Sequence, residues 1–170
     1  QVCDDVYPHL SAGLKTETAE LCLSAGCCWD ESASSCYLPK INGYIYKESS
    51  SDDYSFGGDL TLKEPSGAFG DDYTDLLVEF SQETVDRVHM KIVPKGVSRW
   101  EVPEESIKRP GGQYKLKDAN MKYNIIPDPF QVVIRKSNSL QDLFFLSKMF
   151  VYQDQYIQFV LGTPKNTGII

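Results

Sequence analysis

The side chains with the most specific chemistry in this sequence are five cysteines, all within the first 36 of its 170 residues. Thiols can pair as disulfides or bind zinc, and a zinc site usually draws its four ligands from Cys-x-x-Cys pairs and histidines. The sequence has no Cys-x-x-Cys, and only His9 lies near the cluster. The spacing therefore favours disulfides formed in an oxidising compartment. We expect no metal and no cofactor. The cysteines are Cys3, Cys22, Cys27, Cys28 and Cys36.

Two of these cysteines are adjacent, Cys27 and Cys28, and Trp29 follows them directly. Neighbouring cysteines rarely bond to each other because the ring that they would close is strained. Each must therefore find a more distant partner or remain a free thiol.

From Cys22 onward the spacing is Cys-x4-Cys-Cys-Trp-x6-Cys, which resembles the trefoil (P-type) module. That family has six cysteines, paired first to fifth, second to fourth and third to sixth. Only one cysteine precedes Cys22 here, and its distance suits the first of the six. The resemblance thus implies the disulfides Cys3–Cys28 and Cys22–Cys36, with Cys27 unpaired. The alternative is Cys3–Cys27, with Cys28 unpaired.

Trefoil modules can bind sugars through a cleft of aromatic and acidic side chains. The resemblance makes Tyr7, Trp29 and Asp30 the candidates for such a cleft. The alternative for Trp29 is that its ring only covers the disulfides.

Beyond the cysteine cluster, the sequence is rich in short apolar or alternating runs separated by Gly, Pro, Asn and Asp, as is typical of strands. In residues 87–94, Val88, Met90 and Ile92 fall on one face of a strand, and His89 and Lys91 on the other. We expect turns or loops at 111–112 and in the polar tract 47–59. The expected strands are 44–47, 60–63, 75–81, 87–94, 123–127, 130–137, 143–147, 150–154 and 156–162.

These elements predict a mainly β chain in two parts, with a boundary near Pro39 where the composition changes. Residues 1–40 are expected to form the small disulfide-rich trefoil module. Residues 41–170 are expected to form an antiparallel β-sandwich, because many short strands follow one another closely.

Three segments of the second part, in order, are similar to glycoside hydrolase family 31. The first contains Arg99, Trp100, Glu101, Val102 and Pro103, the second Pro129, Phe130 and Arg135, and the third Gln155, Tyr156, Gln158, Leu161 and Pro164. A trefoil module followed by a β-sandwich stands at the front of the secretory-pathway α-glucosidases of this family. The resemblance implies that a catalytic (β/α)8 barrel follows outside this chain.

The implied function is that of the non-catalytic N-terminal portion of a retaining α-glucosidase that releases terminal α-1,4-linked glucose. A glycosidase needs two carboxyl groups flanking the scissile bond, and the family's two catalytic aspartates belong to the barrel. We therefore assign no catalytic residue among the 24 acidic side chains of this chain. The acidic groups at Asp52–Asp53, Asp71–Asp72 and Asp75 lack the ordered spacing of a calcium loop and are expected to be solvated.

The expected partners are the rest of the same enzyme, namely the barrel and C-terminal β domains, in one chain or as a separate chain after proteolytic nicking. The large apolar side chains of residues 150–170 favour such a covering partner. Maltooligosaccharides and other α-glucosides would be the substrates. The net charge of −7 argues against nucleic acid, and no apolar run approaches the roughly 20 residues of a membrane span.

The localisation implied by the resemblance is the secretory pathway: extracellular, lysosomal or as a membrane-tethered ectodomain. The alternative function, from a different class, is a free-standing secreted carbohydrate-binding protein with a lectin-like trefoil.

Overall fold

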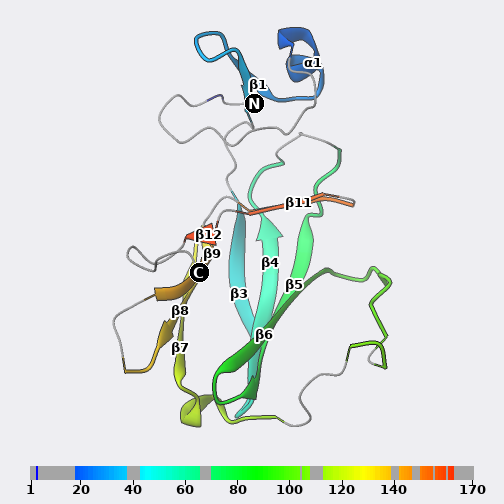
Figure 1. Ribbon diagram of the computed structural model, residues 1–170. Coiled ribbons are helices and arrows are strands. Elements are labelled where there is room, and N and C mark those ends of the chain that lie inside the picture. The colour runs from blue at the N-terminus through cyan, green and yellow to red at the C-terminus, as the bar shows by residue number, and fades with distance from the viewer. Residues whose placement is uncertain are drawn as a thin grey trace.

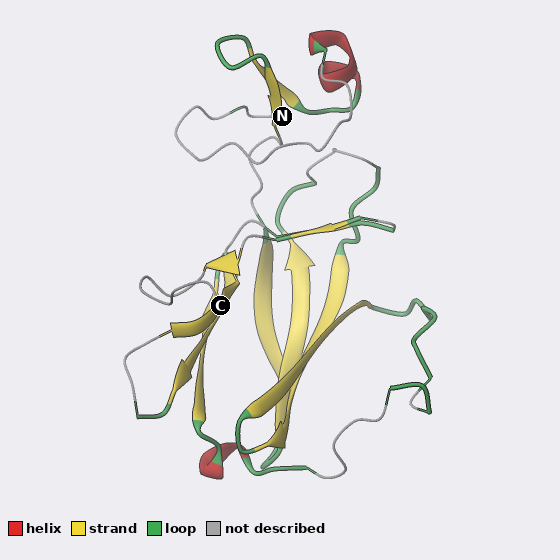
Figure 2. Cartoon of the chain, viewed as in Figure 1, coloured by secondary structure: helices red, strands yellow, loops and turns green. Residues whose placement is uncertain are grey.

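The computed structural model shows a mainly β chain with antiparallel sheets (Figures 1 and 2). A small cysteine-rich unit lies at one end of the molecule, and two four-stranded sheets contain most of the other described strands. Of the helices in the described part of the chain, none has the length and apolar character needed to cross a bilayer. The structure describes residues 3, 18–37, 43–65, 70–103, 105–107, 113–138, 142–146, 150–154, 156–159 and 161–162.

The cysteine-rich unit consists of a short helix, α1 (Ala19–Ser24), and a hairpin of β1 (Cys28–Asp30) and β2 (Ser35–Tyr37). Thr18 caps the helix, because its hydroxyl accepts a hydrogen bond from the amide of Leu21 at 3.3 Å. So short a helix has little stability of its own. The disulfides that fix both the helix and the hairpin must therefore hold this unit together.

The first sheet has the order β3-β4-β5-β6, and every neighbouring pair is antiparallel. Strict alternation in β5 places Leu76, Val78, Phe80 and Gln82 on the buried face. This face supplies half of the sandwich core. The strands are β3 (Tyr44–Ser51), β4 (Ser55–Leu62), β5 (Asp75–Thr84) and β6 (Arg87–Pro94).

The second sheet has the order β12-β9-β8-β7. Its strands are β7 (Met121–Pro127), β8 (Phe130–Lys136), β9 (Asp142–Leu146) and β12 (Leu161–Gly162), and the 3-10 helix η1 (Leu116–Asp118) precedes β7. β8 lies between two neighbours, and three consecutive side chains, Val132 to Ile134, are buried. β7 and β8 are joined by a tight turn that contains a cis bond between Asp128 and Pro129.

The main core lies between the two sheets, as expected for a sandwich. Its fully buried members come from both, including Tyr44, Leu60 and Phe80 from the first sheet and Phe130 and Leu146 from the second. The sheets approach each other along β3, which lies next to β7 and β8. A third element, the small hairpin of β10 (Val151–Tyr152) and β11 (Ile157–Gln158), closes one end through a bridge between Asp72 and Gln153.

Two sequence expectations about these strands were wrong. The polar tract 47–59 is largely strand, since β3 runs through Ser51 and β4 begins at Ser55. Only a tight turn separates them, and the Asp52 carboxylate holds it by accepting from the amides of Tyr54 and Ser55, both at 2.7 Å.

The expected single strand at 156–162 is instead two short strands in different sheets, β11 and β12. The proposed boundary near Pro39 and the turn at 111–112 lie outside the described residues.

Candidate functional site

The cysteine-rich unit contains two disulfides, Cys3–Cys28 and Cys22–Cys36. These are the pairs that the trefoil resemblance implies. Cys27 is a free thiol and is buried. Burial raises the pKa of this thiol above its usual range, because desolvation disfavours the thiolate. The adjacent cysteines thus differ: Cys27 is a free thiol, and Cys28 forms a disulfide.

Two of the candidate sugar-binding residues, Trp29 and Asp30, lie in the described part of the chain. Trp29 is half-buried and packs against the cluster of Cys22, Cys27, Cys36 and Val151. This position agrees with a covering role for its ring. Tyr7 lies outside the described residues. Sugar binding by this unit stays a prediction.

The third candidate, Asp30, holds the turn of the β1–β2 hairpin. Its carboxylate accepts hydrogen bonds from the amide and hydroxyl of Ser32, at 2.9 and 2.7 Å, and from the amide of Ala33 at 3.0 Å. A carboxylate engaged by three donors of its own turn has a structural role.

A concave surface lined by described residues lies elsewhere, beside β6. This hollow, called here the β6 groove, has a volume of about 640 Å³. β6 contributes His89 and Lys91, the following segment contributes residues 99–101, and the β10–β11 hairpin contributes Tyr152 and Ile157. The groove therefore contains the Arg99-Trp100-Glu101 segment that the family resemblance singles out.

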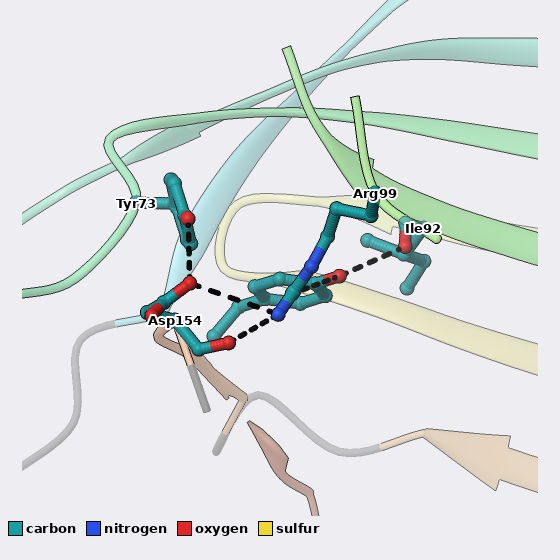
Figure 3. Close-up of polar contacts among 5 residues, drawn as sticks. Tyr73, Ile92, Arg99 and Asp154 are labelled. Carbon is teal, nitrogen blue, oxygen red and sulfur yellow. Dashed lines mark hydrogen bonds and ion pairs between the residues drawn. The ribbon is translucent and has the colours of Figure 1, made fainter. Parts of the chain in front are cut away.

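Arg99 is the central contact of the β6 groove (Figure 3). One guanidinium nitrogen, Nη1, donates to the Tyr152 hydroxyl at 3.2 Å, and the guanidinium carbon lies 5.8 Å from the centre of that ring. The other nitrogen, Nη2, donates to the backbone carbonyl of Asp154 and lies 3.8 Å from its carboxylate. The hydrogen bond to Tyr152 raises the pKa of Arg99 further, so this side chain is always charged.

Two tyrosines extend this contact into the first sheet. The Tyr73 hydroxyl donates to the Asp154 carboxylate at 3.2 Å, and the Tyr152 hydroxyl donates to the carbonyl of Ile92 in β6 at 3.4 Å (Figure 3). Burial, together with the bond to Asp154, raises the pKa of Tyr73. We call this set of Tyr73, Ile92, Arg99, Tyr152 and Asp154 the Arg99 clamp.

The other polar groups of the groove are also engaged. Lys91 forms an ion pair with Glu101 at 2.5 Å. The neighbouring side chain of Trp100 is 80% exposed. Each acidic side chain in the groove therefore has a basic partner, Lys91 for Glu101 and Arg99 for Asp154. Such paired groups hold a loop in place.

No described part of the chain offers a metal site either: nowhere in it do three His, Cys, Asp or Glu side chains come together to hold an ion. Two of the acidic side chains that the sequence singled out have other partners. Asp52 holds its turn, as described above, and Asp53 forms an ion pair with Lys115 at 2.8 Å.

Sequence reasoning found Arg99 but missed its partners. Tyr73 and Asp154 lie 81 residues apart, and Arg99 and Asp154 lie 55 apart. No local pattern connects residues at such separations. The buried amide of Gln153, which donates to the Asp72 carboxylate at 3.0 Å, was missed for the same reason.

Comparison with known proteins gives consistent matches over most of the chain. Intestinal sucrase-isomaltase from Suncus murinus is 31% identical over 153 residues, which is 86% of this chain and 8% of that protein. Alpha-xylosidase 1 from Arabidopsis thaliana is 24% identical over 135 residues, covering 70% of this chain and 15% of its own length.

A probable alpha/beta-glucosidase from Aspergillus flavus is 28% identical over 127 residues, covering 73% of this chain and 14% of its own length. The chain thus spans well under a fifth of each of these relatives. No family model matches it.

Proposed function

This chain is homologous to the N-terminal part of glycoside hydrolase family 31 enzymes, and from this relationship we propose that it is the non-catalytic N-terminal portion of a retaining α-glucosidase. In that enzyme it supports a catalytic (β/α)8 barrel supplied by the rest of the polypeptide. The enzyme hydrolyses terminal non-reducing α-1,4-linked glucose. Residues 1–40 are its trefoil module and residues 41–170 its N-terminal sandwich.

One observation carries this proposal. The chain aligns over 86% of its length with a sucrase-isomaltase, yet the aligned segment makes up only 8% of that protein. A segment that small, related throughout to a far larger enzyme, fits a supporting part better than a complete catalyst. The pairing of the groove carboxylates with Lys91 and Arg99 agrees with this role.

The disulfides favour a protein made in the secretory pathway. We propose an extracellular, lysosomal or membrane-tethered location for the whole enzyme. The Arg99 clamp would then fix the segment 97–103, which carries the family motif, in a constant position relative to the sandwich.

The test compares two preparations. The mature protein that contains this chain is purified from its source, its mass is measured, and both it and the isolated chain are assayed on maltose. We expect a much larger polypeptide, or a tightly bound second one, that releases glucose first as the α-anomer in proton NMR. The isolated chain should be inactive.

A mature protein of the mass of this chain, with no partner and no glucosidase activity, would refute the proposal. Turnover by the rigorously purified isolated chain would refute the assignment of catalysis to the remainder of the enzyme.

A further inference from the structure

The outer edge of β6 is unpaired within the described part of the chain, because β6 is the last strand in the order β3-β4-β5-β6. Backbone groups in an antiparallel strand point alternately to its two sides. The amide of Lys95 donates to the carbonyl of Asp75 at 2.9 Å, continuing the β5–β6 ladder beyond Pro94. Val93, Lys91 and His89 precede Lys95 in steps of two residues. Like Lys95, they therefore direct their backbone groups to β5.

Val88, Met90 and Ile92 alternate with these residues. They direct their backbone groups away from β5, toward the open edge of the sheet. The contact with Tyr152 agrees with this assignment, since its hydroxyl reaches the carbonyl of Ile92. Exposed edges of this kind are templates for another strand unless the protein covers them.

The face of this edge strand that looks toward the second sheet is apolar, and the space beside it is incompletely filled. Two cavities lie between β6 and the second sheet, of about 350 and 280 Å³, and both are lined by Met90 and Phe144. Close to them, Leu143, Ile157 and Phe159 are 46 to 49% exposed. The sandwich is therefore closed on the β3 side, where β7 and β8 lie next to it, and open between β6 and β9.

The opposite face of the same strand, which looks away from the second sheet, is polar. It is the β6 groove, with the Lys91–Glu101 ion pair and the charged head of Arg99. The edge thus offers backbone donors and acceptors between an apolar side and a polar side. An extended segment with alternating apolar and polar side chains matches all three surfaces.

We propose that the free edge of β6 receives one further antiparallel or parallel β-strand, supplied by the remainder of the enzyme polypeptide. Its apolar side chains fill the two cavities beside Met90, and its polar side chains face Lys91 and Glu101. The source of this strand rests on the proposed function, and most of each homologous enzyme lies outside the segment that matches this chain.

A second copy of this chain suits the edge less well. In an antiparallel pair of two β6 strands, Val88, Met90 and Ile92 of each copy would stay packed against their own core. They could not fill the two cavities beside Met90 of the other copy.

The proposal is tested by hydrogen exchange, resolved to single amides, on the mature protein and on the isolated chain. The amides of His89, Lys91 and Val93 report the β5–β6 ladder and should be protected in both samples, which controls for folding. The amides of Val88, Met90 and Ile92 should exchange freely in the isolated chain. In the mature protein we expect their exchange to be at least ~100-fold slower.

Fast exchange of Val88 and Met90 in a mature protein that hydrolyses maltose would overturn the strand proposal and leave the proposed function standing. Protection of these amides in a mature protein without glucosidase activity would support the strand and refute the function. Protection in the isolated chain that rises with its concentration, together with a dimer mass, would overturn the proposal in favour of self-association.

Discussion

Arg99 joins parts of the chain that are distant in sequence, because its guanidinium contacts the ring of Tyr152 and the backbone and carboxylate of Asp154. A planar group with several donors can make all of these contacts at once, whereas an ammonium cannot. The identity of this residue therefore matters beyond its charge.

Replacing Arg99 by Ala should lower the free energy of unfolding by about 1–2 kcal/mol. This loss is smaller than that of a fully buried charged hydrogen bond, because the Arg99 side chain is 31% exposed. Arg99→Lys should recover less than half of this loss. Urea unfolding measures both. Lys95→Ala is the matched control, since its ion pair with Asp59 is mostly exposed and should contribute less than about 0.5 kcal/mol. Equal losses in Arg99→Ala and Lys95→Ala would show that the clamp adds no stability.

The free thiol of Cys27 gives a second prediction at this scale. The native chain should react with iodoacetamide at pH 8 at least ~100-fold more slowly than the unfolded, unreduced chain, because Cys27 is buried and must be exposed by local opening. Its raised pKa acts in the same direction, since the reactive thiolate forms only at higher pH. Mass spectrometry should count one modified thiol per chain after unfolding. Rapid native labelling at Cys27 would contradict its burial.

At the scale of elements, β4 depends on two adjacent glycines. A Cβ on Gly58 would lie 2.3 Å from the carbonyl oxygen of Lys47, and one on Gly57 would lie 2.4 Å from the carbonyl oxygen of Val78. The register of β3 also shifts between Glu48 and Ser50, directly opposite these glycines. The neighbouring strands thus approach β4 too closely for any side chain there.

Gly58→Ala should therefore destabilise the chain by about 2–3 kcal/mol, because backbone atoms of β3 must move. Thr61→Ala, at an exposed position of the same strand, should cost less than about 1 kcal/mol. Thermal unfolding followed by circular dichroism compares the two. A Gly58→Ala variant as stable as Thr61→Ala would mean that β3 adapts freely.

The two sheets also share a polar contact, in which the Tyr123 hydroxyl of β7 donates to the side-chain carbonyl of the buried Gln82 in β5. Burial raises the pKa of Tyr123 to about 12. The neutral phenol is therefore favoured by folding, and the stability that it contributes is complete below the ordinary tyrosine pKa of about 10. This contribution should fall as the pH rises from about 10 to 12.

Tyr123→Phe should lower stability at pH 7 by about 1–2 kcal/mol, because Gln82 loses its donor. The same variant should lose less stability than the parent chain between pH 10 and 12. Urea unfolding across this range measures the difference. Parallel pH profiles for the two proteins would show that Tyr123 does not titrate with unfolding.

Alternation in sequence predicted β6 well, since Val88, Met90 and Ile92 do pack against the core. The same approach failed for residues 47–59, where serines and glycines mask the pattern and the strand depends on close backbone packing. It could not find the Arg99 clamp or the cavities beside Met90, because both arise from segments that only the tertiary fold brings together.

At the scale of the whole molecule, the cysteine-rich unit and the sandwich part share a small core. Val151 of β10 is buried with Cys22, Cys27 and Cys36, and Tyr156 packs against the same cluster. The disulfide Cys22–Cys36 should therefore affect the β10–β11 hairpin as well as its own unit.

Cys36→Ser should unfold the cysteine-rich unit, since a unit of this size has almost no core beyond its bridges. Because Val151 then loses its cover, exchange of the β10–β11 amides should speed up, while amides of β5 keep their protection. Hydrogen exchange with mass spectrometry measures both regions. Unchanged exchange in β10–β11 would show that the shared cluster is not a structural link.

The burial of Val151 among the cysteines also changes what a cut in the chain would mean. Trypsin cleavage after Lys40 would break the peptide connection between the two parts, yet neither disulfide crosses that point. The fragments would still share the apolar cluster around Val151. They should therefore migrate as one particle in gel filtration and separate only on a denaturing gel, so that the two parts behave as one folded unit even when the chain between them is cut.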